Sequence, residues 1–217
     1  MQKEEDNQKQ VQLAQAVFQA LDERFPTARC ELNYQNPFQL LIATMLSAQS
    51  TDERVNLITE SLFRELPTPA HYLALGQAGV EERIKSLGLF RTKAKNIMAV
   101  CRILVEQFDS NVPADFETLK QFPGVGRKTA SVVVSNAFGI PAMPVDTHVF
   151  RVANRIGLTA GRTPGQVETQ LKGLLPPESW ILTHHLLIFH GRRICTARHP
   201  DCAACPIRNL CQEKSSR

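Results

Sequence analysis

The stretch from Leu119 to His148 reads LKQFPGVGRKTASVVVSNAFGIPAMPVDTH and contains a tight turn, a helical pattern and a second turn ending in a carboxylate. The first turn, PGVG at 123–126, joins a proline that fixes its own φ to glycines that adopt a positive φ easily. Apolar residues recur at helical spacing before the turn, in 115–122, and after it, in 127–138. The stretch predicts a helix, a glycine hairpin and a second helix.

A glycine hairpin that opens a helix presents backbone N–H groups at the positive end of the helix dipole, which suits an anion. The spacing between Gly124 and Lys128 is too short to wrap a nucleotide triphosphate. We therefore expect Gly124, Val125, Gly126 and Arg127 to bind one phosphate of a nucleic acid backbone. The alternative is a helix–turn–helix corner that only packs, and the rest of the chain must decide between them.

Composition fits a soluble protein with a polyanionic partner. The 217 residues are 43% hydrophobic, enough for one large domain or two small ones, and a net charge of +4 is mildly basic. No apolar run approaches the roughly 20 residues that span a bilayer. The polar start MQKEEDNQKQ resembles neither a secretory signal nor a transit peptide. We expect a cytoplasmic protein.

The hydrophobic pattern is helical almost everywhere, with almost no alternating stretch of β-branched residues. The segment 37–49 is apolar on nearly all sides, so we expect a central, buried helix capped by Asn36. The class predicted is all-α, with roughly ten helices and short connections. The expected helices are 10–25, 37–49, 53–66, a short one from Thr68, 80–87, 90–108, 115–122, 127–138, 147–157, 164–175 and 177–190.

Six cysteines fall into two groups. Cys30 and Cys101 stand alone, and we expect them to be buried thiols. The other four lie within 17 residues near the C-terminus, in the pattern C-x6-C-x2-C-x5-C: Cys195, Cys202, Cys205 and Cys211. Such a group in a cytoplasmic chain indicates a metal centre rather than disulfides.

The spacing of these four cysteines favours an iron–sulfur cluster over zinc. Structural zinc sites usually consist of two separate knuckles, each with a close cysteine pair, whereas here only Cys202 and Cys205 form one. Uneven short loops are typical of thiolate-bound clusters, although zinc remains open from the residues alone. Nearby arginines either offset the charge of the thiolates or contact a second phosphate.

The sequence resembles the endonuclease III family of helix-hairpin-helix DNA glycosylases. The resemblance covers nearly the whole chain and rests on MLSAQSTD (45–52), GLFRTKA (88–94), LKQFPGVGRKTASVV (119–133), PVDTHVFRVANR (144–155) and the four cysteines. It implies a 4Fe-4S cluster on those cysteines. It also implies two helical lobes: a six-helix barrel over 30–140 with the hairpin at 115–138, and an iron–sulfur domain formed by 1–29 and 141–217, with its cluster loop at 195–211.

The resemblance also implies roles for four residues. Lys128 would attack C1′ of the deoxyribose and form a Schiff base, and Asp146 would stabilise the oxocarbenium charge and assist proton transfer. Gln49 and Leu89 would fill the gap left by a flipped nucleotide. Each has a plainer reading: a phosphate-binding lysine, a helix cap, a helix-end amide and a loop leucine.

The activity implied is base-excision repair by a bifunctional DNA N-glycosylase and AP lyase. It would remove oxidised or ring-saturated pyrimidines such as thymine glycol from duplex DNA lying in a groove between the lobes, as a monomer associated with a bacterial nucleoid. An adenine-mismatch glycosylase fits less well, because its catalytic glutamate would fall at Ala43 and it lacks a lysine at the position of Lys128. A thymine-mismatch glycosylase also lacks that lysine. A non-catalytic DNA-binding module would not need both Lys128 and Asp146.

Overall fold

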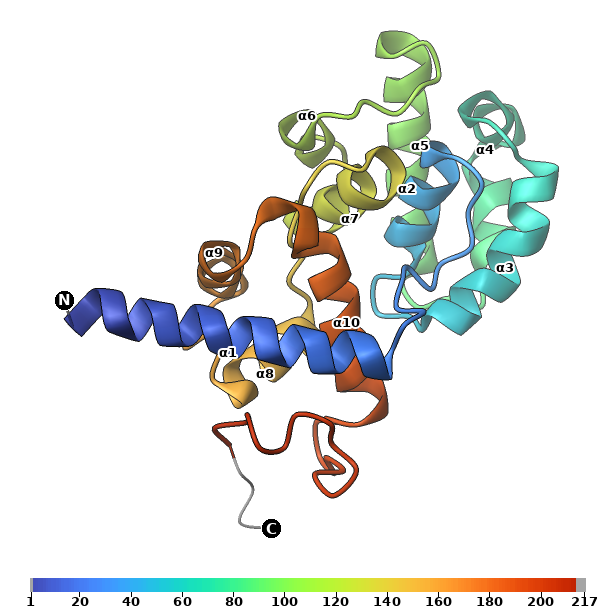
Figure 1. The fold of residues 1–217 in the computed structure, drawn as a ribbon. Helices are drawn as coiled ribbons and strands as arrows, with labels where there is room; N and C mark the ends of the chain where they lie inside the picture. Colours follow the sequence, from blue (N-terminus) through green and yellow to red (C-terminus); the bar gives the residue numbers. More distant parts are fainter. Residues whose placement is uncertain (1, 214–217) are drawn as a thin grey trace. The chain divides into compact units, whose positions relative to one another are not determined.

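The structure, a computed structural model, describes residues 2–213, with side chains from Glu4 onward. Within this range the regular structure is entirely helical, with ten α-helices and one 3-10 helix, which confirms the predicted all-α class (Figure 1). The elements are α1 (Gln2–Arg24), α2 (Pro37–Leu46), α3 (Asp52–Glu65), α4 (Pro69–Ile84), α5 (Phe90–Gln107), α6 (Phe116–Lys120), α7 (Arg127–Phe138), α8 (Thr147–Ile156), α9 (Pro164–Leu174), η1 (Pro177–Ser179) and α10 (Trp180–Arg193).

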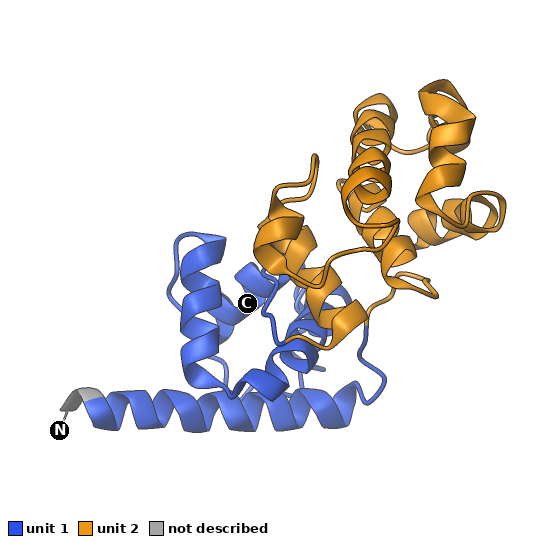
Figure 2. Cartoon of the chain, turned by 90° about the horizontal axis from the view of Figure 1, so that it is seen from above, with its two compact units in different colours: residues 1–29, 141–217 blue, residues 30–140 orange. Residues whose placement is uncertain are grey.

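The helices form two compact units, coloured separately in Figure 2. The terminal unit combines the chain up to Arg29 with the chain from Pro141 onward. The central unit is the continuous segment Cys30–Ile140, which contains the hairpin. None of the described helices combines the length and apolar character that a bilayer-spanning segment needs.

The central unit is built around α2. Every residue of α2 after Pro37 is buried, and the helix packs against α3, α5 and α7. Asn36 caps it, since its Oδ1 accepts a hydrogen bond of 2.9 Å from the Gln39 amide. The Phe38 ring meets Tyr72 of α4 edge to face, with centroids 5.5 Å apart. Burial of this apolar helix, at about 25 cal/mol per Å² of apolar surface, holds the unit together.

The terminal unit has its own core, contributed by α1, α8, α9 and α10. Val17 and Leu21 of α1 are fully buried there, although the remainder of that helix is largely polar. Phe25, just after α1, meets the Phe189 ring of α10 edge to face at 6.1 Å. Helix α8 packs against α10 and α9, and the residues after α10 form the cysteine loop.

Several helix bounds differ from the predicted ones, among them the following three. Helix α1 begins at Gln2 rather than residue 10, because its first turns are rich in good helix formers and carry Glu4 and Glu5 at the positive end of the dipole. One helix, α4, replaces two predicted ones and bends at Gly76, whose φ is 79° and ψ is 164°. Helix α2 ends at Leu46 instead of residue 49, which frees the following loop for the site described next.

Candidate functional site

The glycine hairpin forms as predicted, between α6 and α7. Asp115 caps α6 by accepting a 2.6 Å hydrogen bond from the Thr118 amide, and bonding to Thr118 lowers the pKa of this exposed carboxyl. Gly126 is the N-cap of α7 and supplies no side-chain hydrogen bond to the first amides of that helix. A hairpin of this kind leaves the start of α7 suited to an external anion.

Gly124 is held close to helix α5. Its φ is +76°, and a Cβ added there would lie 2.6 Å from Nδ2 and 3.0 Å from Cβ of Asn96. Both the backbone conformation and the lack of space require glycine at this position. Helix α5 therefore packs directly against the hairpin through Asn96.

Val125 contributes differently from its expected role as a phosphate contact. Its side chain is buried, and its amide donates a 3.0 Å hydrogen bond to the Phe122 carbonyl within the turn. Arg127 is exposed, and its guanidinium lies over the Phe116 ring, 5.4 Å from the centroid. The Val125 amide is thus engaged within the turn, while phosphate contacts by Gly124, Gly126 and Arg127 stay predictions.

Lys128 lies exposed in the first turn of α7, above the buried Ala130 and Val133 of the same helix. The charge of Lys128 affects the pKa of the Cys30 thiol. Burial raises that pKa and Asp52 raises it further, whereas Lys128 lowers it. Lys128 is therefore an exposed lysine close enough to the half-buried Cys30 to affect its pKa.

Gln49 and Leu89 share an unusual backbone conformation. Gln49 has a φ of 55° and Leu89 a φ of 58°, both in the left-handed region that residues with side chains seldom adopt. Both are exposed, with 56% of the Leu89 surface in contact with solvent. Strained, exposed residues of this type occur at functional sites, which is what their predicted role requires.

Asp146 caps α8, as the simpler of its two predicted roles requires. Its Oδ1 accepts hydrogen bonds of 2.8 Å from the amides of both His148 and Val149. Its other oxygen, Oδ2, makes no hydrogen bond within the described chain. The carboxylate is half-buried and held in place through one oxygen, while the other remains available for chemistry.

The four C-terminal cysteines surround one cavity of about 200 Å³, which buried side chains such as Ile207 and His190 also line. None of the four forms a disulfide, and burial raises the pKa of Cys205 and of Cys211. Among the described residues, no three acidic, histidine or cysteine side chains are placed to hold one metal ion. Four thiols around a cavity, with Nη1 of Arg155 at 3.7 Å from Cys195 Sγ, fit a thiolate-bound cluster.

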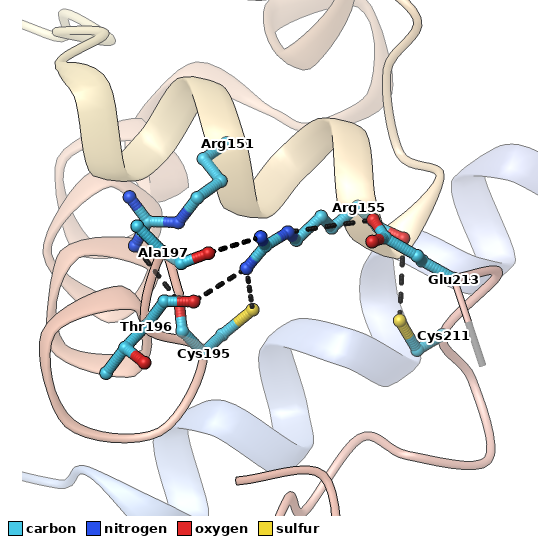
Figure 3. A network of polar contacts seen from close by, with 7 residues as sticks. All are labelled: Arg151, Arg155, Cys195, Thr196, Ala197, Cys211 and Glu213. Carbon is cyan, nitrogen blue, oxygen red and sulfur yellow. Dashed lines mark hydrogen bonds and ion pairs between the residues drawn. The ribbon is translucent and has the colours of Figure 1, made fainter. Parts of the chain in front are cut away.

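Two arginines of α8 fasten the cysteine loop to that helix (Figure 3). Arg155 donates hydrogen bonds of 2.7 Å to the Thr196 carbonyl and 2.9 Å to the Ala197 carbonyl. Arg151 donates to the Cys195 carbonyl at 3.0 Å. Sequence reasoning gave neither arginine a role, although their spacing of four residues places them on one face of the helix.

His148 also lies in this part of α8. Its Nδ1 is 3.3 Å from an Arg151 nitrogen. Burial lowers the pKa of the His148 imidazole, while Asp146 opposes that shift. His148 was assigned no role from the sequence, and in the structure it contacts Arg151, its own helix cap Asp146 and the backbone of Gly191 in α10.

Comparison with known proteins assigns the chain to a class of DNA repair proteins. Residues 42–177 match the model of the HhH-GPD superfamily of base excision DNA repair proteins. Residues 195–211 match the iron–sulfur binding domain of endonuclease III, beginning and ending on Cys195 and Cys211.

Relatives narrow the class further. The chain is 51% identical to endonuclease III of Rickettsia conorii, over 93% of this chain and 96% of the relative. It is 48% identical to endonuclease III of Escherichia coli K12, over 91% and 94%. A structure of a non-covalent endonuclease III–DNA complex superposes with a TM-score of 0.91 at 45% identity, covering 94% of this chain and 96% of that one.

The chain belongs to the endonuclease III family. It is accordingly a base-excision-repair enzyme, a DNA glycosylase with lyase activity at abasic sites, and it binds DNA and an iron–sulfur cluster. The resemblance inferred from sequence motifs, the enzyme class and the cofactor are confirmed.

Proposed function

We propose that the enzyme removes oxidised or ring-saturated pyrimidines, of the thymine glycol type, from duplex DNA and then cleaves the strand 3′ to the abasic site. The observation that carries the proposal is the position of Lys128: exposed, in the first turn of α7, directly after a hairpin suited to a DNA phosphate. A phosphate bound there would bring the adjacent deoxyribose within reach of the amine.

In this proposal Lys128 is the nucleophile. Its Nζ forms a bond to C1′ while the bond from C1′ to the damaged base breaks, and the base leaves with the electron pair and takes up a proton. Opening of the C1′–O4′ bond then gives a Schiff base. Loss of a C2′ proton from that species expels the 3′ phosphate by β-elimination, and water releases the lysine.

Asp146 serves the same reaction as the carboxylate that stabilises positive charge on the sugar. The hydrogen bonds to Oδ1 keep it fixed at the start of α8, while Oδ2 remains for the sugar or for proton transfer. An Asp146→Asn variant retains the shape of the cap but lacks the charge, so we expect it to fold normally and to lose most of its activity.

Recognition of the duplex falls to the hairpin and to two exposed residues. Gly124, Gly126 and Arg127 would hold the phosphate backbone. Leu89 would occupy the space of the extruded nucleotide, while Gln49 would bond to the base left without a partner. We propose that the enzyme acts in this way as a monomer, on DNA of a bacterial nucleoid.

Cys195, Cys202, Cys205 and Cys211 are proposed as the ligands of a 4Fe-4S cluster. When bound, the cluster supplies metal–thiolate bonds that tie the loop 195–211 together. The two arginines of α8 then link this loop to the helix that Asp146 caps. The cluster is thus given a structural part in the terminal unit.

The proposal is tested by base release and strand cleavage. Duplexes that carry one thymine glycol, one adenine opposite 8-oxoguanine, or one thymine opposite guanine are incubated with the enzyme loaded with its cluster. We expect release and cleavage on the first duplex and little on the others. Preferential release of adenine, or of the mismatched thymine, would overturn the substrate assignment.

A further inference from the structure

Lys93 is a buried cation with a single side-chain partner. Only 6% of its surface is exposed, although it carries an ammonium group. Nζ donates a 3.0 Å hydrogen bond to the Ser50 hydroxyl, and within the described chain it has no ion pair. Burial lowers the pKa of the Lys93 ammonium. Burying a charge with only a neutral partner costs folding free energy, so stability alone does not explain this arrangement.

The position of Lys93 indicates a role that would explain why a buried ammonium is kept there. Its side chain reaches Ser50, the residue after Gln49, while its own amide donates a 3.0 Å hydrogen bond to the Leu89 carbonyl. One residue is thus bonded to the residue after Gln49 and to Leu89, and Gln49 and Leu89 are two of the four described non-glycine residues with positive φ. Such conformations persist only where the surroundings hold them in place.

Helix α5 has a third connection to the DNA-binding surface. Gly124 of the hairpin lies close against Asn96. Asn96 follows Lys93 by three residues and lies on the same side of the helix. The first two turns of α5 therefore adjoin every segment of the central unit to which a DNA contact is assigned: the loop with Gln49, the turn with Leu89 and the hairpin.

We propose that Lys93 is a positioning residue: its bond to Ser50 fastens the loop after α2 to the start of α5 and so holds Gln49 and Leu89 in the shape that fills a gap in the duplex. This inference rests on the proposed function of Gln49 and Leu89. Because Nζ points to Ser50 and is shielded from solvent, a direct phosphate contact by Lys93 is the less favoured reading.

The test compares Lys93→Met, Ser50→Ala, the double variant and the control Lys95→Met, which removes an exposed lysine of the same helix. Fluorescence anisotropy gives the affinity of the intact holoenzyme for a duplex with a tetrahydrofuran abasic analogue and for the undamaged duplex, at several salt concentrations. Thermal unfolding is measured for each variant. Release of thymine glycol by the native enzyme is measured separately, so a failure of the proposed substrate is distinguishable from a failure of the inference.

We expect Lys93→Met to lower the ratio of the two affinities about tenfold, equivalent to about 1.4 kcal/mol, because part of the binding energy must then restore the left-handed conformations. Ser50→Ala should lower the ratio to a similar extent. The double variant should lower it little further, because both substitutions break the same hydrogen bond, that between Lys93 and Ser50. The unfolding temperature of Lys93→Met should be unchanged or higher, because an apolar side chain of similar length replaces a buried charge.

Three results would overturn the inference. An unchanged ratio in both single variants would remove any positioning role. An equal loss on both duplexes, with the salt dependence reduced by about one counterion, would make Lys93 a phosphate contact. A fall in the ratio that follows a clear fall in unfolding temperature in both variants would make the bond merely structural. Lys95→Met is expected to keep the native ratio.

Discussion

Substitution of Gly124 by alanine tests how tightly α5 supports the hairpin. Alanine at a φ of +76° costs about 1–2 kcal/mol, because its Cβ crowds the backbone. The added Cβ would also lie 2.6 Å from Asn96 Nδ2, and crowding of this kind costs about 1–3 kcal/mol. Asn96 is only half-buried and can shift, so we expect a total loss of roughly 2–4 kcal/mol in unfolding free energy.

The assay is urea unfolding followed by circular dichroism, with Gly126→Ala as the matched control. Gly126 has a φ of −87° and no atom within 4 Å of an added Cβ, so alanine there should cost at most about 1 kcal/mol, as an inferior N-cap. Adding Asn96→Ala to Gly124→Ala should recover the part of the crowding loss caused by Nδ2 and Cγ of Asn96, but not the contact with Asn96 Cβ or the conformational part. Equal effects of the two alanine variants, or a loss at Gly124 below about 1 kcal/mol, would refute the reasoning.

Three further predictions follow from the site. Gly126→Ser should leave stability unchanged or higher but weaken DNA binding several-fold, because the hydroxyl caps the amides that a phosphate would use; unaltered binding would count against the anion site. Cys202→Ser should lower the thermal unfolding temperature and the visible absorbance of the cluster, and an unchanged melting curve would contradict a structural part for it. Burial raises the pKa of Cys101 from 9.0 to about 12, so its contribution to stability is complete below pH 9 and lost as pH rises towards 12. A Cys101→Ala variant should lack that part of the alkaline loss in urea unfolding.

Local signals in the sequence were sufficient for much of the fold. Helix α7 has the predicted bounds, because the glycine hairpin before it and Gly139 after it are strong local signals for the start and end of a helix. The cap Asn36 was readable for the same reason. The start of α1 and the joining of α4 across Gly76 were missed, because neither a polar helical extension nor a bend has a distinct periodicity.

The sequence names the candidate site residues, but it does not show the contacts that hold them in place. A sequence does not show that Gln49 and Leu89 adopt positive φ, because non-glycine residues in that conformation have no reliable signature. Nor does it show the contacts of Arg151 and Arg155 with a loop about 40 positions away, or that of Lys93 with Ser50, 43 positions away. These contacts join segments that only tertiary packing brings together.

The central claim is that Lys128 forms a covalent bond to the sugar, and borohydride trapping tests it most directly. The enzyme is incubated with a duplex containing one thymine glycol, reduced, and run on a denaturing gel beside Lys128→Ala and Asp146→Asn. The account predicts a covalent protein–DNA complex for the native enzyme, none for Lys128→Ala, and much less for Asp146→Asn. A complex that survives in Lys128→Ala, or tight duplex binding by the native enzyme without any complex or cut strand, would contradict it.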